Sequence, residues 1–274
     1  MALRARNKVA SIVLAAGRGS RMTGFDGNKA TLPLIPSEGI FVGKRPFIEE
    51  ILSQLPRGPR AIIVHHDAKR VIGLSKQNNV VHIRQPVLNG TGGAVLAASG
   101  FMKEVAADVI IITMGDVPLV RAQTYENLLS VMEDVNAHGA LIAFRPQDKK
   151  KYGCLVTEYG FVKKIIEWQY WKDLPADKQA KLELCNSGIY AFNKDILLTY
   201  LDSLAKKPHR VEKTINGRKV MIEEYFLTDL IEWMVADGHR ITFWIAPEYE
   251  VIGVDTPDVL REVQLIYGKL TGSH

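Results

Sequence analysis

The most informative part of this chain is Val9-Ala10-Ser11-Ile12-Val13-Leu14-Ala15-Ala16-Gly17-Arg18-Gly19-Ser20-Arg21-Met22. Its first half is an unbroken run of small and apolar residues, which predicts a strand buried on both faces. Its second half is a loop of glycines and arginines, whose backbone N–H and guanidinium groups suit a polyanionic ligand. Lys29 follows this loop and adds a further positive charge. We therefore expect a nucleoside triphosphate to bind where the first strand ends.

Short apolar runs alternate with amphipathic patterns along the rest of the chain. We predict strands at residues 9–14, 61–64, 80–83, 109–113, 140–144, 154–157, 161–166, 187–192, 241–245 and 251–254. Apolar residues at helical spacing begin at Tyr125 and at Leu227, and a further helix is expected to begin at Thr256-Pro257. This alternation predicts an α/β fold, with a doubly wound, mostly parallel, Rossmann-like sheet.

The pattern changes after residue 144. A hairpin around Tyr159-Gly160 and a polar stretch over residues 172–183 indicate a small lobe that contains β-strands. We therefore predict a single domain over residues 1–274. Its parts are a nucleotide-binding half (about 1–144), the lobe (about 145–225), and closing strands with a C-terminal helix (about 226–274).

The composition argues against several classes of protein. Of the 274 residues, 47% are hydrophobic and 24% are charged, as in ordinary globular domains. The early apolar run is too short to span a bilayer, and no cleavage site follows it, so we expect neither a membrane partner nor a signal peptide. The net charge of +5 comes from dispersed residues, so we expect no nucleic-acid partner. Cys154 and Cys185 form no disulfide framework, which indicates reduced thiols in a cytoplasmic protein.

Three interpretations of the loop at residues 17–22 compete. A P-loop requires Gly-Lys-Ser/Thr at its end, and this loop ends in Met22. A dinucleotide-binding fingerprint requires a third glycine, which Met22 replaces, so a nucleotide-dependent oxidoreductase is disfavoured. A plain strand-to-helix turn also commonly contains glycine, and the loop alone leaves this interpretation open.

Further motifs follow the loop along the chain. They are Gln85-x-x-x-x-Gly90-Thr91-Gly92, Gly115-Asp116-Val117-Pro118-Leu119, Tyr152-Gly153, Glu167, Asn186-Ser187-Gly188-Ile189 and Tyr225-Phe226-Leu227-Thr228-Asp229. Together with the loop and Lys29, this ordered series resembles the sugar-phosphate nucleotidyltransferases over essentially the whole chain. It is most similar to the N-terminal uridylyltransferase domain of the bacterial bifunctional N-acetylglucosamine-1-phosphate uridylyltransferase/acetyltransferases.

The resemblance implies that an NTP reacts with a sugar 1-phosphate to give an NDP-sugar and pyrophosphate. UTP, and a product such as UDP-N-acetylglucosamine or a related UDP-sugar, are the favoured substrate and product. Both reactants are anions and the attacking phosphate oxygen is already ionised, so no protein nucleophile is needed. Basic side chains, backbone N–H groups and Mg²⁺ should therefore carry the catalysis. The expected partners are these small molecules, and the oligomeric state stays open.

The resemblance also assigns roles to individual residues. Arg21 fits the β- and γ-phosphates and Lys29 fits the α-phosphate, so both are the expected catalytic cations. Asp116, at a strand end, and Asp255 are the implied Mg²⁺ ligands. The implied nucleotide-binding residues are Leu14, Ala15, Ala16, Gly17, Gly19, Gln85, Gly90 and Thr91, and the implied sugar-binding residues are Gly115, Gly153, Glu167 and Asn186.

Several positions keep alternatives open. Met114 stands where the similar enzymes usually carry Tyr, and the residues after Glu167 are Trp168-Gln169-Tyr170-Trp171, so the identity of the sugar is undetermined. The two tryptophans either stack on the sugar or form core of the lobe. Asp255 is alternatively a residue that only begins a helix. His65-His66-Asp67 is interpreted as a polar loop at a strand end rather than as a metal site.

Alternative functions also stay open within and beyond this fold. The same fold could use CTP, GTP or dTTP, or an alcohol phosphate as acceptor. A catalytically silent sensor that binds an NDP-sugar is an alternative from another class. The joint presence of Arg21, Lys29 and Asp116 favours the enzyme, because a sensor has no need of all three.

Overall fold

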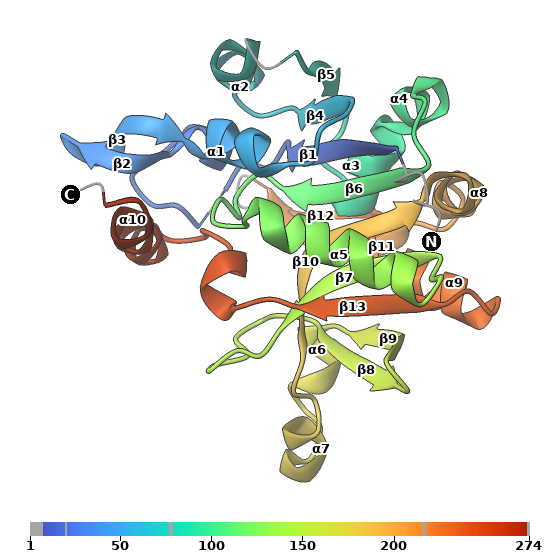
Figure 1. The fold of residues 1–274 in the computed structure, drawn as a ribbon. Helices are drawn as coiled ribbons and strands as arrows, with labels where there is room; N and C mark the ends of the chain where they lie inside the picture. The colour runs from blue at the N-terminus through green and yellow to red at the C-terminus, as the bar shows by residue number, and fades with distance from the viewer. Residues whose placement is uncertain (1–7, 20, 77–78, 216–217, 273–274) are drawn as a thin grey trace.

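The first predicted strand forms as β1 (Val9–Ala15) and lies between two parallel neighbours, β4 (Arg60–Val64) and β6 (Val109–Met114), in the computed structural model of the protein (Figure 1). The structure describes residues 8–19, 21–76, 79–215 and 218–272. Within these ranges one sheet joins nine strands, and its main path runs in the order β13-β7-β10-β6-β1-β4-β5. The remaining strands of this path are β5 (Val81–Arg84), β7 (Gly139–Phe144), β10 (Cys185–Asn193) and β13 (Ile241–Ile245).

The sheet is mostly parallel, and the predicted fold class is confirmed. Parallel ladders join β4 and β6 to β1, β5 to β4, and β13 to β7. Along this path the exception is β10, which runs antiparallel to both β6 and β7. β10 also begins beside β8 (Cys154–Glu158), which forms the predicted hairpin with β9 (Phe161–Ile166).

Helices cover both faces of the sheet because successive strand residues point in opposite directions. The side chain of Val13 faces one apolar core and that of Ile12 faces the other. The helices that pack into the core of Val13 are α1 (Phe47–Gln54), α2 (Ala68–Ser75), α5 (Ala122–Asp134) and α10 (Pro257–Thr271). Those that pack into the core of Ile12 are α3 (Gly90–Ala97), α4 (Ser99–Glu104), α8 (Lys194–Leu204) and α9 (Thr228–Ala236). The result is a three-layer α/β sandwich.

Two hairpins lie outside the main sheet and were not predicted. The first pairs β2 (Pro33–Ser37) with β3 (Gly39–Pro46) and packs on α10. There, the side-chain amide of Gln264 donates to the carbonyls of Pro33 and Ile40 at 2.8 Å each. The second hairpin pairs β11 (His209–Ile215) with β12 (Arg218–Glu224).

The strand predicted at residues 251–254 is wrong. Residues Glu248–Val251 form a short 3₁₀ helix, and the backbone N–H of Val254 makes a single bond to the carbonyl of Asp116 at 2.9 Å. Val251 and Val254 are fully buried, so they are apolar because they fill the core rather than because they form a strand. The bond from Val254 holds the start of α10 against the end of β6. The predicted helix start is confirmed, with Thr256 as the N-cap and Pro257 as the first helical residue.

The range predicted for the lobe, about 145–225, contains a strand of the main sheet. β10 lies between β6 and β7, whereas the β8–β9 hairpin projects from the sheet together with α6 (Trp168–Trp171) and α7 (Ala176–Ala180) (Figure 1). The predicted division into a nucleotide-binding half and a lobe stays a prediction. Within the described ranges no helix is both long and apolar enough to cross a membrane.

Candidate active site

A cavity of about 370 Å³ opens at the carboxyl ends of β1, β5 and β6. Ligands of open α/β sheets bind at such strand ends. Ten of the predicted site residues line it: Leu14, Ala15, Ala16, Gly17, Lys29, Gln85, Gly90, Thr91, Gly115 and Asp116. It is also lined by Arg18, Asn28, Ala30, Leu88, Ala94, Met114 and Glu224, most of which the sequence analysis did not single out.

Two carboxylates and two cations from four separate segments meet beside this cavity. Asp116 follows β6, Asp255 precedes α10, and Lys29 begins a 3₁₀ turn, Lys29–Thr31. The ammonium group of Lys29 donates to Asp116 and, at 2.8 Å, to Oδ1 of Asp255. The other oxygen of Asp255 lies 2.8 Å from the guanidinium of Arg21. The structure thus brings the four residues predicted for catalysis and metal binding into one cluster.

The charge of Lys29 is secured by this cluster. Burial by itself lowers the pKa of a lysine, and the side chain of Lys29 is only 12% exposed. Asp116 and Asp255 outweigh burial through charge and hydrogen bonding, and the net pKa of Lys29 is raised. Lys29 therefore stays a cation at neutral pH.

Local contacts explain the position of Lys29. The side-chain oxygen of Asn28 accepts from the N–H of Ala30 at 2.9 Å and caps the turn, while its amide donates to the carbonyls of Ala15 and His66 at 2.6 and 2.9 Å. Asn28 thus ties the turn to the end of β1.

Gly19 in the loop also lies against Lys29. It has φ of +62°, and a Cβ atom there would lie 2.8 Å from Cγ of Lys29. Gly19 does not line the cavity itself; its place in the glycine motif is explained by the stem of the lysine.

The two carboxylates fit a divalent metal that also binds a substrate. Mg²⁺ in enzymes is typically held by one or two carboxylates, with waters and substrate phosphates as the other ligands. Within the described ranges no group of three or more His, Cys, Asp or Glu residues could form a complete metal site from protein alone. Asp116 and Asp255 therefore suit a metal that arrives with a phosphate ligand.

Gln85, predicted to bind the nucleotide, is buried in the lining of the cavity. Its side-chain amide nitrogen donates to Oδ1 of Asn89 at 2.9 Å and to the carbonyl of Gly90 at 3.3 Å. A ring nitrogen of His65 lies 2.6 Å from the backbone carbonyl of Gln85, and one of His66 lies 2.7 Å from the carbonyl of Asp26. Both histidines therefore bind backbone carbonyls, as a polar loop at a strand end would.

Three of the predicted sugar-binding residues are neighbours on the β8–β10 side. The N–H of Asn186 donates to the carbonyl of Gly153 at 2.8 Å, and a Cβ atom on Gly153 would lie 3.2 Å from Oε2 of Glu167. None of these three is among the described residues that line the cavity. Met114 does line it, and its side chain would lie 3.0 Å from a Cβ atom on Gly188, two residues after Asn186. Gly115, the fourth predicted residue, lines the cavity next to Met114.

The carboxylate of Glu167 is partly withdrawn from water. Burial raises its pKa, the hydrogen bond from Thr228 (3.0 Å) lowers it, and the charge of Asp229 raises it, with a net rise. Glu167 is therefore a carboxylate whose protonation lies closer to neutral pH than usual.

The two tryptophans of the lobe differ. Trp171 is buried in the same apolar core as Val13, and its Nε1 donates to the carbonyl of Tyr152 at 2.8 Å, so it is a core residue. The ring of Trp168 is half-buried and has the ammonium groups of Lys151 and Lys172 at 4.9 Å from its centroid. Contacts of this kind are cation–π interactions. Trp171 is thus not placed to stack on a sugar.

The predicted free cysteines are close in space. Cys154 of β8 pairs with Cys185 of β10, and their Sγ atoms are 3.7 Å apart as free thiols. Although 31 residues separate them in sequence, the two strands bring them together, next in the chain to Gly153 and Asn186.

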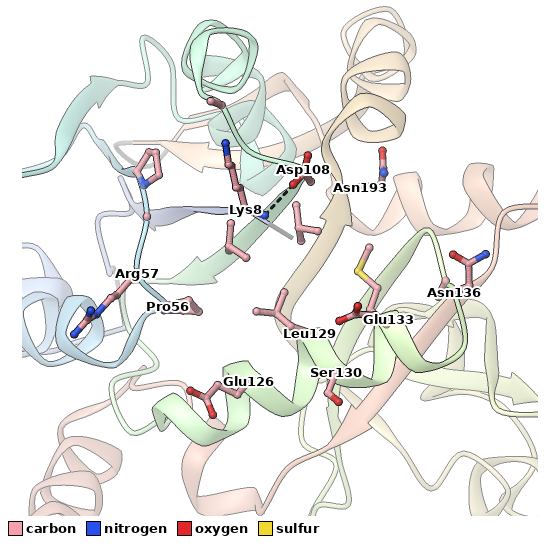
Figure 2. A pocket seen from close by; sticks show the side chains of 17 residues that line it. Lys8, Pro56, Arg57, Asp108, Glu126, Leu129, Ser130, Glu133, Asn136 and Asn193 are labelled. Atoms are coloured by element: carbon pink, nitrogen blue, oxygen red, sulfur yellow. Dashed lines mark hydrogen bonds between the residues drawn. The ribbon is translucent and has the colours of Figure 1, made fainter. Parts of the chain in front are cut away.

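A larger cavity of about 1210 Å³ lies at the opposite edge, beside the amino ends of β1 and β6. Figure 2 shows it between Arg57, Glu126 and Glu133, with the N–H of Lys8 donating to Asp108 at 2.8 Å. None of the predicted site residues lines it. The smaller cavity, at the carboxyl ends of the strands, is therefore the candidate active site.

Comparisons with known proteins identify the family of the chain. Residues 11–180 match the model of the MobA-like NTP transferase domain. The chain is 28% identical over 263 residues to the bifunctional protein GlmU of Clostridium botulinum (strain 657 / Type Ba4), covering 94% of this chain and 52% of that protein. It is 31% identical over 268 residues to the same-named protein of Rhodopseudomonas palustris (strain TIE-1), covering 96% and 53%. The chain thus spans about half the length of these relatives.

Two solved structures share the fold. One is the uridine diphosphate N-acetylglucosamine pyrophosphorylase of Trypanosoma brucei, with a TM-score of 0.69 and 15% identity, covering 94% of this chain and 65% of that one. The other is CMP:2-keto-3-deoxy-manno-octonic acid synthetase in complex with CTP, with a TM-score of 0.65 and 18% identity, covering 96% and 99%. At these identities the likeness is one of fold.

Proposed function

The chain belongs to the family of MobA-like NTP transferase domains, and we propose that it makes an NDP-sugar and pyrophosphate from an NTP and a sugar 1-phosphate. The proposed nucleotide is UTP, and the proposed acceptor is a hexose or N-acetylhexosamine 1-phosphate. The name of the uridine diphosphate N-acetylglucosamine pyrophosphorylase from Trypanosoma brucei and the ordered series of motifs in the sequence support this choice.

The observation that carries the proposal is the cluster of Lys29, Arg21, Asp116 and Asp255 beside the cavity. A nucleotidyl group that is transferred between two anionic species needs positive charge around the α-phosphate. A buried lysine whose pKa is raised meets that need, and two carboxylates, one after β6 and one before α10, meet the need for a metal site.

In the proposed reaction an oxygen of the sugar phosphate attacks the α-phosphorus, and pyrophosphate leaves in line with it. Lys29 binds the α-phosphate region, where the charges of both substrates meet. The exposed guanidinium of Arg21 binds the departing β- and γ-phosphates, to which its planar fork is matched. Mg²⁺ held by Asp116 and Asp255 would supply neutralising charge for the phosphates.

The cavity and a group of residues outside its lining would bind the rest of the substrates. Gln85, Gly90, Thr91 and the backbone at residues 14–17 form the proposed pocket for the base and ribose. Gly115, Gly153, Glu167 and Asn186 form the proposed pocket for the sugar, in which the carboxylate of Glu167 accepts a hydroxyl hydrogen. The small molecules are the proposed partners of this chain.

Two measurements test the proposal. A thermal-shift panel of NTPs with and without Mg²⁺ identifies the base, and pyrophosphate release with a set of sugar 1-phosphates then identifies the acceptor. We expect UTP with Mg²⁺ to raise the melting temperature most, and an N-acetylhexosamine or hexose 1-phosphate to release pyrophosphate. If no pair of substrates turns over while NDP-sugars still stabilise the protein, it is a sensor rather than an enzyme.

A further inference from the structure

We propose that Thr228 is a positioning residue that holds the carboxylate of Glu167 and ties it to the nucleotide side of the cavity. This inference rests on the proposed function, because it concerns the acceptor pocket of that site. It assigns a role to the Tyr225-Phe226-Leu227-Thr228-Asp229 motif, to which no role has been given above.

The motif is bonded along its length to the start of α3. The N–H of Tyr225 donates to the carbonyl of Asn89, and the carbonyl of Tyr225 accepts from the N–H of Gly92, both at 2.9 Å. The N–H of Leu227 donates to Oγ1 of Thr91 at 3.3 Å. The motif therefore moves with the segment that lines the nucleotide side.

The glycines of that segment permit this close approach. A Cβ atom on Gly90, which has φ of +90°, would lie 2.4 Å from the carbonyl oxygen of Tyr225. A Cβ atom on Gly92 would lie 2.8 Å from the same carbonyl. Both distances are shorter than non-bonded atoms tolerate, so the backbone of Tyr225 requires glycine at these positions.

Thr228 then reaches the acceptor side. It is the first residue of α9, and its Oγ1 donates to Oε1 of Glu167 at 3.0 Å. Among the described residues none donates to the other oxygen, Oε2, which lies on the side of Gly153. The hydroxyl thus fixes one oxygen and leaves the second available for a ligand hydroxyl.

The far end of the motif is anchored as well. Oδ2 of Asp229 lies 2.8 Å from Nε2 of His209 in β11, and the ring of His209 lies 4.8 Å from that of Phe226. With the nucleotide segment on one side and the β11–β12 hairpin on the other, the backbone of Thr228 is held in place. A fixed donor is what a partly buried carboxylate needs to stay ionised in one orientation.

The test compares two substitutions of Thr228. Thr228→Val keeps the shape but removes the donor, whereas Thr228→Ser keeps the donor. We expect Thr228→Val to raise KM for the sugar 1-phosphate about tenfold, as befits a lost hydrogen bond to a charged group. KM for the NTP should stay unchanged. The rise of KM for the sugar phosphate at acidic pH should begin at a higher pH than in the wild type. Thr228→Ser should return KM for the sugar phosphate and its pH dependence to those of the wild type.

A binding measurement gives the same comparison without turnover. Calorimetry should show that Thr228→Val weakens binding of the NDP-sugar and leaves binding of the NDP alone unchanged. If Thr228→Val does not fold, Thr228→Ala against Thr228→Ser makes the comparison. Equal acceptor affinity in the valine and serine variants would overturn the inference.

Glu167→Gln separates this inference from the proposed function. If Glu167→Gln leaves KM and binding of the sugar unchanged, the proposed acceptor pocket is wrong and Thr228 has nothing to position. If Glu167→Gln raises KM for the sugar but Thr228→Val does not, the pocket stands and the positioning role of Thr228 is wrong.

Discussion

Nζ of Lys29 lies 2.8 Å from Oδ1 of Asp255, although 226 positions separate the two residues in the chain. The same ammonium group also donates to Asp116, so it stands between the two carboxylates expected to hold a metal. Phosphates and a divalent cation would replace these contacts with new ones, because each partner in the cluster is a good ligand for part of the substrate. Catalysis and metal binding are therefore expected to depend on one set of charges.

Removal of a carboxylate should affect turnover in a graded way. We expect Asp116→Ala to lower kcat roughly 1000-fold and Asp255→Ala to lower it strongly, because each loses a charge that faces the metal. Asp255→Asn should be milder, since the amide oxygen can still bind a metal. Pyrophosphate release at increasing Mg²⁺ measures this. An Asp255→Ala enzyme with unchanged dependence on Mg²⁺ would mean that Asp255 only begins a helix.

The two cations should act mainly on the rate. We expect Lys29→Ala and Arg21→Ala to lower kcat about 100-fold while changing KM for the sugar phosphate less, because phosphate charge redistributes as pyrophosphate leaves. Lys29→Arg should restore kcat only in part, since the wide guanidinium fork of arginine replaces the compact ammonium charge of lysine. Steady-state kinetics with both substrates varied checks this. A normal kcat with an altered sugar preference would place these residues in the acceptor pocket.

Substitution by alanine at two helical glycines should change the free energy of unfolding in opposite directions. Gly73 in α2 has open space where a Cβ atom would go, so Gly73→Ala should raise the free energy of unfolding by about 0.5–1 kcal/mol. Gly92 in α3 faces the backbone of Tyr225 at 2.8 Å, so Gly92→Ala should lower it by about 1–3 kcal/mol. Denaturant unfolding of both variants measures the difference. A stabilised Gly92→Ala variant would contradict the close contact.

Acidic pH should weaken binding of the sugar phosphate. Burial and the charge of Asp229 raise the pKa of Glu167 against the opposing bond from Thr228, so Glu167 gains its proton at a higher pH than an ordinary carboxylic acid. Cys154 and Tyr190 are its other titratable neighbours, and burial raises the pKa of Tyr190 further above this range. Protonated Glu167 is a weaker acceptor for a hydroxyl, so KM for the sugar phosphate should rise as pH falls.

The control for this pH effect is Glu167→Gln. The phosphate of the acceptor also titrates, with a second pKa of about 6, and contributes to the profile of every variant. The difference between the wild-type and Glu167→Gln profiles therefore isolates the carboxylate. Identical profiles would show that Glu167 does not titrate in the acceptor pocket.

Replacement of the two tryptophans by alanine should lower the free energy of unfolding to very different degrees. Trp171→Ala should lower the free energy of unfolding by about 3–5 kcal/mol, because it leaves a cavity and removes the donor to Tyr152. Trp168→Ala should lower the free energy of unfolding much less, since the ring of Trp168 is half-buried and contacts exposed lysines. Thermal and denaturant unfolding give both values. A larger loss of unfolding free energy for Trp168→Ala than for Trp171→Ala would contradict the assignment of Trp171 to the core.

Much of the fold was predictable because the signal is local. The run Val9–Ala15 is apolar on both faces, and a strand with that pattern is buried between layers wherever it lies. The β2–β3 and β11–β12 hairpins escaped prediction because strands outside the main sheet carry exposed polar residues without a clear alternation. Residues 251–254 misled the prediction, because burial in the core and pairing in a sheet select the same residue types.

The order of residues along the chain contains the chemistry of the site: a glycine and arginine loop, a lysine after it, and an aspartate after an apolar strand. The contacts between Asp255 and Lys29, between Thr228 and Glu167, and between Tyr225 and the glycines at 90 and 92 arise from folding. Strand propensity and charge are properties of neighbouring residues, whereas a hydrogen bond at 3 Å between distant segments depends on how whole layers pack.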